Sequence, residues 1–287
     1  MLKKQNRAGY LFITPLIIIF SVFFLYSFYF MIRNGFFKVN ISLKNPVFVG
    51  LDNYRMLFTD PRFIRALFNT LLFAFLSILA GITIGFILSI LLSFTFRGKG
   101  FFHTLFFVPV LMPLALIAEV FAMMLEYRYG TFNELLRFLH LDFLALRWLA
   151  LPGLAYLSVI ALNIYLIGLP IMYYTADLAS MDLQMLEAAE VDGAGMFRKI
   201  TGIIFPALIN SHKTVTLSVM LSSFRAFETV FLLTKGGPGY STEITGTYLY
   251  SFAASGINVG YVSAASVVIL ILAFVISFLQ IQAYKRK

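Results

Sequence analysis

The chain has 287 residues, of which 60% are hydrophobic and only 12% are charged. Because a soluble globular chain carries about twice that share of charge, this composition excludes a soluble protein and indicates an integral membrane protein. The absence of cysteine excludes disulfides and thiolate metal sites, and the net charge of +9 is explained by basic membrane flanks facing anionic lipid rather than by nucleic acid.

Six apolar segments along the chain are long enough to cross a membrane. Crossing ~30 Å of hydrocarbon takes about 20 helical residues. We therefore predict an all-α polytopic membrane protein, a single transmembrane domain over residues 1–287, with spans at about 10–32, 66–96, 101–125, 150–176, 204–233 and 260–283. The first span follows Lys3, Lys4 and Arg7, as the core of a signal peptide would. It is too long for one and lacks a small-residue cleavage site, so we expect it to be retained.

The basic residues predict the orientation of these spans. Short loops rich in Lys and Arg stay in the cytoplasm. The segments MLKKQNR, RGKG and KRK are short and basic, whereas the basic residues of Arg33–Arg65 are spread over a long loop. We therefore expect both termini in the cytoplasm. The external loops then contain a helix-like run at Phe132–His140 and the turn formers Gly236-Gly237-Pro238-Gly239.

One sizeable cytoplasmic loop remains, at about residues 180–203, and it contains the sequence EAAEVDGAGMFRKITG. Ser180 or Asp182 can accept the unpaired N–H groups that begin a helix, and Gly193 can adopt the left-handed conformation that ends one. A second amphipathic helix then leads into the fifth span. The residues alone leave two interpretations open. The loop is either a helical hairpin lying on lipid headgroups or a docking element whose small residues, Ala188 and Ala189, let a partner approach closely.

This loop resembles the EAA loop of permease subunits from binding-protein-dependent ABC importers. In that family Glu-Ala-Ala is followed by Asp-Gly-Ala and, at a fixed distance, by Ile-x-Leu-Pro. The matching residues here are Glu187, Ala188, Ala189, Asp192, Gly193, Ala194, Ile203 and Pro206. Two positions depart from the pattern, because Phe205 replaces a leucine and Asp182 stands where proline is frequent. We call residues 180–203 the EAA segment.

Other segments extend the resemblance to nearly the whole chain. FETVFLLTKGGPGYSTE resembles the end of the fifth span and the following loop of sugar permeases, where Thr-x-Gly-Gly-Pro-Gly is common. NIYLIGLP resembles the end of the fourth span, although the tryptophan often found there is Ile164 in this chain. These motifs indicate the maltose and oligosaccharide importer branch, and within it the first of two paired, non-identical permeases.

The resemblance implies a MetI-like fold of six transmembrane helices in the cytoplasmic membrane of a bacterium or archaeon. It also implies four kinds of partner besides membrane lipid: a second, different permease, an ABC ATPase dimer, an extracellular or periplasmic solute-binding protein and a sugar. This chain lacks the Gly-x-x-x-x-Gly-Lys-[Ser/Thr] phosphate loop. We therefore expect a transport subunit that is not an enzyme and binds no cofactor, with ATP and Mg bound by the ATPase.

The resemblance also implies roles for individual residues. The EAA residues Glu187, Ala188, Ala189, Asp192 and Gly193 would contact the ATPase, with Glu187 forming an ionic contact and Gly193 providing the bend. The family places its substrate cavity along the fourth and fifth spans. There, the candidates for the substrate path are Asn163, Tyr165, Gly168, Ser222, Ser223 and Phe227. Serines in spans also serve helix packing, and this alternative stays open for each position.

Charged residues inside spans indicate function or pairing. Arg225 and Glu228 are three residues apart, so we expect them to share a helix face and neutralise one another. The residues leave open whether they also line the path, and they give no role for Glu119. The sequence does not distinguish among a sugar, a polyol and a glycerol-phosphate ester as cargo.

Two other classes of function fit the residues less well. A secondary transporter driven by protons or sodium would need an Asp, Glu or His near the middle of a span, and the six predicted spans have none there. A membrane enzyme would need paired carboxylates, a metal cluster or a nucleophile beside a base. The three histidines, His103, His140 and His212, are too scattered for a metal site.

Overall fold

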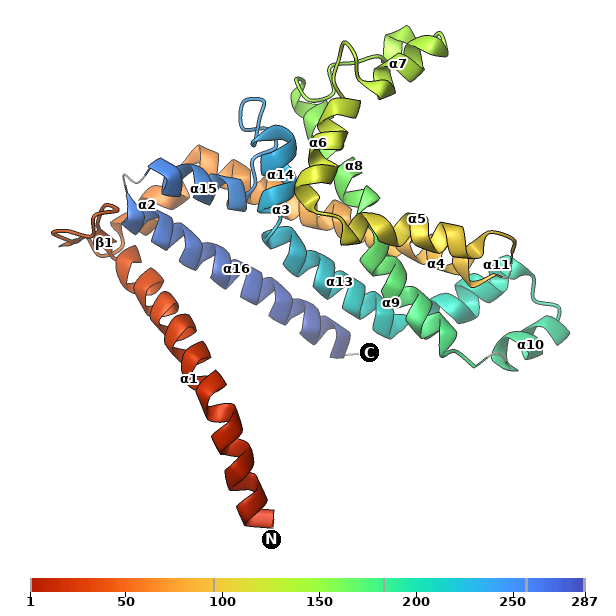
Figure 1. Ribbon diagram of the computed structural model, residues 1–287, viewed down its shortest axis with the longest axis horizontal. Coiled ribbons are helices and arrows are strands. Elements are labelled where there is room, and N and C mark those ends of the chain that lie inside the picture. The colour runs from red at the N-terminus through yellow and green to blue at the C-terminus, as the bar shows by residue number, and fades with distance from the viewer. Residues whose placement is uncertain (1, 95, 183, 256–257, 286–287) are drawn as a thin grey trace. The chain divides into compact units, whose positions relative to one another are not determined.

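The computed structural model describes residues 2–94, 96–182, 184–255 and 258–285, which form a mostly helical chain (Figure 1). Two compact units can be distinguished. The first contains residues 1–63 and 249–272, and the second contains residues 64–248 and 273–287. The helices α3, α15 and α16 contribute residues to both units.

The first unit begins with α1 (Leu2–Gly35) and a short antiparallel ribbon of β1 (Phe37–Lys38) and β2 (Val47–Phe48). The buried side chain of Asn53, in α2 (Asp52–Thr59), joins these parts because its Nδ2 donates to the carbonyl oxygens of Gly35 and Phe37. None of the most apolar window of α1 is buried within the described chain, although Phe30 and Met31 near its C-terminal end line a pocket together with Phe252 and Val262. Lipid or another subunit must therefore cover α1.

The second unit contains most of the helices, in an order that follows the predicted spans. Its elements are α3 (Pro61–Ala80), η1 (Gly81–Gly85), α4 (Phe86–Ser93), α5 (Lys99–Leu111), α6 (Leu114–Met124), α7 (Thr131–Phe138), η2 (Asp142–Leu144), α8 (Pro152–Tyr165), α9 (Gly168–Ala179), α10 (Gln184–Val191), α11 (Met196–Lys199), η3 (Ile200–Ile204), α12 (Phe205–Ala207), α13 (Ile209–Phe224), α14 (Phe227–Thr234), α15 (Thr245–Ser255) and α16 (Val259–Lys285). Of these, η1 and η3 are π-helical turns and η2 is a 3-10 turn.

Four helical stretches in the described chain are long and apolar enough to cross a membrane: Tyr10–Gly35, Pro61–Ser93, Pro152–Ala179 and Val259–Tyr284. Two further candidates are bent pairs. The helices α5 and α6 meet at 105°, at Met112 and Pro113, and α13 and α14 meet at 53°. The count reaches six if each bent pair is one span, so the predicted number of six stays a prediction.

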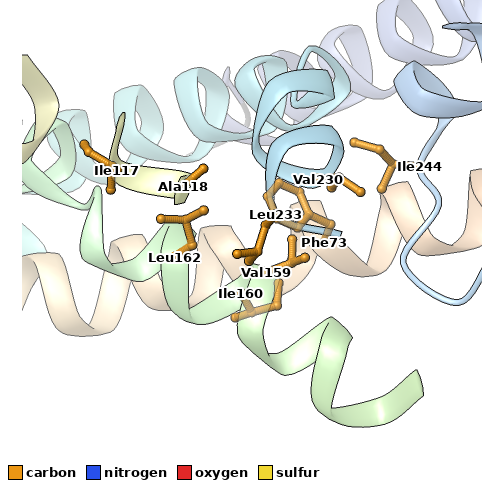
Figure 2. Packing of buried hydrophobic residues seen from close by; sticks show 9 residues of the cluster. All are labelled: Phe73, Ile117, Ala118, Val159, Ile160, Leu162, Val230, Leu233 and Ile244. Carbon is orange, nitrogen blue, oxygen red and sulfur yellow. The ribbon is translucent and has the colours of Figure 1, made fainter. Parts of the chain in front are cut away.

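A hydrophobic cluster holds α3, α6, α8 and α14 together (Figure 2). Phe73 of α3, Val159 of α8 and Val230 of α14 are essentially inaccessible to solvent. Aliphatic residues of α6, α8 and α14 complete the cluster around Phe73. Lipid tails are as apolar as these side chains, so the cluster is stabilised by close van der Waals packing rather than by removal from water. This packing fixes the helices that surround the polar cavity described next.

Candidate functional site

A polar cavity of about 190 Å³ lies among α3, α8, α9, α13 and α14. Its walls are apolar apart from one asparagine and several hydroxyl side chains, and none of its lining residues is charged. The polar lining residues are Ser77, Asn163, Ser218, Ser222, Ser223 and Thr229. These groups form the main concentration of polarity that this cavity offers to a ligand.

Hydrogen bonding leaves the cavity rich in acceptors. The Nδ2 of Asn163 donates to Ser77 Oγ at 2.8 Å, which uses an amide donor and fixes the side chain. Ser223 Oγ donates to the carbonyl oxygen of Val219 at 2.8 Å, and Ser218 Oγ donates to that of Val215 at 3.2 Å. The hydroxyl protons of Ser218 and Ser223 are thus engaged while the lone pairs of these oxygens stay available. Within the described chain, no group donates to the Asn163 Oδ1. A ligand that brings many hydroxyl donors fits this arrangement.

Interrupted helices border the cavity. The helix α8 ends at Tyr165 and α9 begins at Gly168, while α13 ends at Phe224 and α14 begins at Phe227. Irregular backbone at membrane depth is tolerated where it is buried in protein or lines a cavity. Both interruptions lie beside lining residues, since Ile167 and Ala226 belong to the cavity wall.

The structure places the predicted path residues in two groups. Asn163, Ser222 and Ser223 line the polar cavity, whereas the lining does not include Tyr165, Gly168 or Phe227. Tyr165 is 48% exposed, and the centroid of its ring lies 5.3 Å from that of Phe121. The ring of Phe227 stacks on Phe231, with 4.9 Å between the centroids. The six residues stay candidates for the path, but only the first three meet at one cavity.

Gly168 has a packing role that the sequence did not indicate. A Cβ atom at this position would lie 2.6 Å from the carbonyl oxygen of Phe106 and 2.7 Å from a methyl carbon of Val110. Only glycine therefore lets α9 approach α5 this closely. Sequence reasoning also missed Ser77, which lies on the second predicted span, and Thr229, which lies on the fifth beyond Ser222 and Ser223. Their polarity within apolar helices was the one available signal.

The expectation that Arg225 and Glu228 share one helix face is wrong. Arg225 caps the end of α13 and Glu228 lies in the first turn of α14, beyond the bend. The regular spacing of a helix does not continue through this break, and the described residues include no ion pair between the two side chains. Neither residue lines the polar cavity. Glu119 is exposed on α6, and nothing in the structure explains it.

The EAA segment forms a helix, a glycine turn and a second helix. Asp182, rather than Ser180, begins the first helix, because its Oδ1 accepts the backbone N–H of Gln184. Gly193 has a φ of +74°, the predicted left-handed conformation, and the N–H of Ala194 donates to the carbonyl oxygen of Ala189. This is the pairing that satisfies the last carbonyls of a helix ending in glycine.

The outer surface of the EAA segment is open. Glu187, Ala188 and Asp192 are exposed, and Val191 is 89% exposed, so an apolar side chain stands among small and acidic ones. An ion pair between Lys199 Nζ and Glu190 Oε2, 3.1 Å apart, joins α11 to α10. The EAA segment thus exposes to solvent a surface whose two helices are joined by an ion pair.

The inner surface of the same segment packs on the helical bundle. Leu186 of α10 and Ile200 of η3 lie against a buried cluster built from Phe86, Tyr174, Ile204, Leu208 and Val215. A histidine adds polar contacts to this cluster. His212 Nε2 lies 2.9 Å from the carbonyl oxygen of Phe205, and His212 Nδ1 lies 2.7 Å from the hydroxyl of Tyr174. Because a carbonyl oxygen only accepts, Nε2 carries the hydrogen. His212 is therefore a structural link between α9, α12 and α13.

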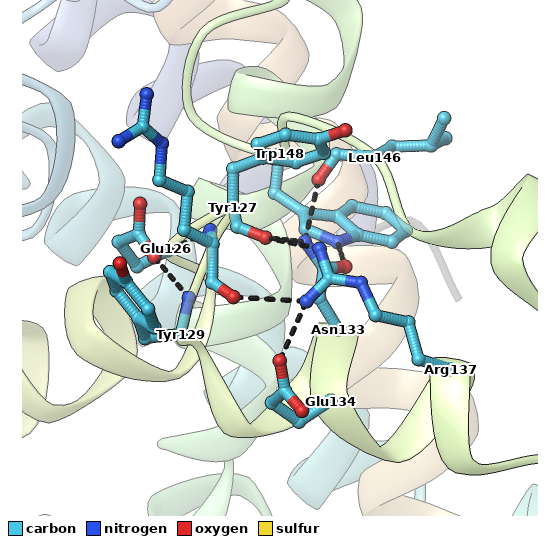
Figure 3. A network of polar contacts seen from close by, with 9 residues as sticks. Glu126, Tyr127, Tyr129, Asn133, Glu134, Arg137, Leu146 and Trp148 are labelled. Atoms are coloured by element: carbon cyan, nitrogen blue, oxygen red, sulfur yellow. Dashed lines mark hydrogen bonds and ion pairs between the residues drawn. The ribbon is translucent and has the colours of Figure 1, made fainter.

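The chain after α6 forms a separate polar network around α7 (Figure 3). The buried Asn133 donates to the carbonyl oxygens of Tyr127 and Leu146 and accepts from Trp148 Nε1 at 2.8 Å. Glu126 accepts backbone N–H bonds from Arg128 and Tyr129, and the bond from Tyr129 is the main reason that the pKa of this exposed carboxyl is lowered. The network holds this loop in one conformation.

Comparison with known proteins identifies the family. Residues 77–286 match the family described as "Binding-protein-dependent transport system inner membrane component". The chain belongs to this family. It is accordingly a multi-pass membrane protein of the permease type, and the resemblance drawn from the EAA segment is confirmed at the level of the family.

Individual relatives cover nearly the whole chain. It is 31% identical to the probable ABC transporter permease protein YurN of Bacillus subtilis, across 99% of this chain and 98% of the relative. It is 30% identical to the arabinooligosaccharides transport system permease protein AraP of Halalkalibacterium halodurans, across 97% of this chain and 88% of the relative. A similar fold is found in a bacterial alginate ABC transporter that was solved in complex with an alginate pentasaccharide-bound periplasmic protein. One chain of that transporter is 25% identical and superposes with a TM-score of 0.86, across 99% of this chain and 96% of that one.

Proposed function

We propose that this chain is a transmembrane permease subunit of an ATP-driven importer that passes a sugar, of oligosaccharide type, across the cytoplasmic membrane of a bacterium or archaeon. A solute-binding protein outside the membrane delivers the sugar. A separate ABC ATPase dimer docks on the EAA segment and supplies the energy, and a second, non-identical permease completes the path. The chain itself hydrolyses no ATP.

The observation that carries this proposal is the contact between the EAA segment and the walls of the polar cavity. Leu186 belongs to the EAA segment and packs in one cluster with Tyr174 of α9 and Val215 of α13. The same two helices contribute Pro170 and Ser218 to the cavity. Because close-packed interiors transmit strain, an ATPase that displaces the EAA segment would move two walls of the cavity.

The character of the cavity supports a sugar as cargo. Its lining offers hydroxyl and amide acceptors and no charge, which suits a neutral ligand with many hydroxyl donors better than a phosphate ester. The relatives support an oligosaccharide, since one is named for arabinooligosaccharides and another was solved with a pentasaccharide of alginate, an acidic polysaccharide, on its binding protein. We assign the neutral members of this class to the present chain.

Assembly is the direct test of the proposal. The chain is produced alone, and again together with a candidate ATPase, second permease and binding protein, and each preparation is assayed for ATP hydrolysis and for sugar uptake into proteoliposomes. We expect uptake only with all components, and stimulation of ATP hydrolysis by the loaded binding protein. ATP hydrolysis by the chain alone, or uptake driven by an ion gradient without ATP, would refute the proposal.

Orientation is tested by single cysteines, because the natural chain has none. The variants Lys4→Cys, Asp192→Cys, Tyr240→Cys and Arg286→Cys are treated in intact cells with a reagent that does not cross the membrane. We expect labelling at position 240 alone, and labelling at all four after the cells are opened. Labelling at 192 but not at 240 in intact cells would reverse the proposed topology.

A further inference from the structure

A second cavity, of about 240 Å³, lies between α13 and the C-terminal part of α16, and we call it the Lys213 cleft. It shares no lining residue with the polar cavity. Leu217 and Ile281 supply its apolar lining. The remaining lining residues are Lys213, Thr214, Gln280 and Tyr284.

Lys213 brings a positive charge that the described chain leaves uncompensated. Its side chain is half-buried, and no Asp or Glu of the described residues forms an ion pair with it. Its nearest recorded partner is the ring of Tyr284, whose centroid lies 5.7 Å from the Lys213 Nζ. Because partial burial of an unpaired charge is unfavourable, the cleft favours an anion beside Lys213.

Gln280 supplies unused hydrogen-bonding groups to the same cleft. Its Nε2 and Oε1 are both shielded from solvent, and neither has a partner within the described chain. Shielded polar groups are almost always hydrogen-bonded in folded proteins, so the Gln280 amide is available to a ligand that enters the cleft. The hydroxyl of Tyr284 donates to Thr216 Oγ1 at 3.3 Å, which holds the ring beside Lys213.

The position of the cleft along α16 indicates its depth. Tyr284 is followed at once by Lys285, Arg286 and Lys287. Tyrosine is typical of the membrane–water interface, and a run of basic residues there attracts anionic lipid. Since Lys213 lies against the ring of Tyr284, it shares this level, where headgroup phosphates are found.

We propose that the Lys213 cleft binds the phosphate of an anionic phospholipid, with an acyl chain along Leu217 and Ile281. Lys213 pairs with the phosphate oxygens and the Gln280 amide donates to the headgroup. The predicted orientation puts this lipid in the inner leaflet. Basic pockets between transmembrane helices on the cytoplasmic side are suited to such headgroups. The proposal depends on the orientation only for the choice of leaflet, which the cysteine labelling above decides independently.

The test uses the complete transporter, reconstituted in vesicles of phosphatidylcholine containing phosphatidylglycerol and then re-extracted in mild detergent. Native mass spectrometry counts the phosphatidylglycerol that remains bound. We expect Lys213→Gln to reduce retention about fivefold, the factor that corresponds to the ~1 kcal/mol contributed by one lysine near a lipid surface. Gln280→Leu should also lose lipid, while Lys213→Arg should retain it. Lys99→Gln is the matched control, because it removes the same charge from another predicted cytoplasmic position and should retain the lipid.

Two competing occupants give different results. If millimolar inorganic phosphate displaces the bound phosphatidylglycerol, the cleft is a site for soluble phosphate and the lipid proposal fails. If a photoreactive group placed at Thr214 crosslinks to the second permease rather than to lipid, a protein surface covers the cleft and the proposal also fails. Equal lipid retention by the natural chain and Lys213→Gln, with unchanged melting temperatures, would overturn it directly.

Discussion

The polar cavity and the EAA segment are two polar regions of an apolar chain, and they handle polarity in opposite ways. The cavity is lined by residues of five helices and contains hydroxyl and amide groups without a charged side chain. The EAA segment carries carboxylates and basic side chains and exposes most of them to water. Under the proposed function, this difference separates two tasks. Neutral acceptors suit a sugar that must both enter and leave, whereas exposed charges suit a surface that must hold a partner in a fixed register.

The largest expected effect comes from Glu187→Lys. If the EAA segment docks on the ATPase, this change places like charges at the contact, which costs several kcal/mol. We expect the ATPase to be lost on purification and uptake to stop. Asp142→Lys makes the same change of charge on the predicted external side and should leave both intact. Normal ATPase recovery with Glu187→Lys would instead favour a hairpin lying on lipid headgroups, because its attraction to anionic lipid would increase.

A backbone change in the same segment tests its shape rather than its charge. Gly193→Val puts a β-branched residue at a φ of +74°, which such residues rarely adopt. We expect the strain, ~1–3 kcal/mol, to misdirect α11, so that uptake falls steeply even where ATPase is still bound. Gly195→Val is the matched control, since Gly195 has a φ of −66° and open space around it. Equal uptake by the two variants would show that the turn is not needed.

Close packing between α5 and α9 can be tested at Gly168. Gly168→Ala would put a methyl group 2.6 Å from the Phe106 carbonyl oxygen, so one helix must shift. Overpacking of this kind costs ~1–3 kcal/mol, and we expect a lower melting temperature of the purified complex. Gly153→Ala, which meets no atom within 4 Å, should leave the melting temperature unchanged. An unchanged value in Gly168→Ala would show that α5 and α9 are not closely packed here.

A milder effect is expected in the polar cavity. Asn163→Leu removes the amide that bonds to Ser77 and, with it, the Oδ1 acceptor that the cavity offers to a ligand. Because a hydrogen bond to a neutral group contributes ~0.5–1.5 kcal/mol, the apparent affinity for the sugar during uptake should fall several-fold, while the ATPase stays bound. Asn210→Leu, on an exposed part of α13, is the control. Unchanged uptake kinetics in both Asn163→Leu and Ser223→Leu would place the path elsewhere.

The sequence predicted where helices form far better than it predicted which helices pack against one another. Apolar runs and the glycine at position 193 are local signals, so the helical stretches, α7 and the left-handed turn could all be anticipated. The cavity depends on which helix faces meet, and Ser77 and Asn163 are 86 residues apart. The prediction that Arg225 and Glu228 share a helix face was wrong for a related reason. A spacing of three residues places two side chains on one face only where the helix continues between them. The family resemblance makes Gly168 a candidate for the substrate path, whereas its close approach to Phe106 comes from tertiary packing, which no motif reveals.

The smallest expected effect concerns the ion pair that braces the EAA segment. Lys199 is 17% exposed and Glu190 is 74% exposed, so water screens the pair in part. Partly exposed pairs are worth ~0.2–1 kcal/mol. We therefore expect Glu190→Gln and Lys199→Gln each to weaken ATPase binding by less than about fivefold. Their double variant should bind the ATPase no more weakly than the worse single variant, because the interaction can be lost only once.

Glu187→Gln provides the comparison for this pair of variants. If charge acts across the docking surface, Glu187→Gln should add fully to either variant, whereas the two bracing residues should not add to each other. Full additivity of Glu190→Gln and Lys199→Gln would show that their contact is irrelevant to docking, and that each acts alone.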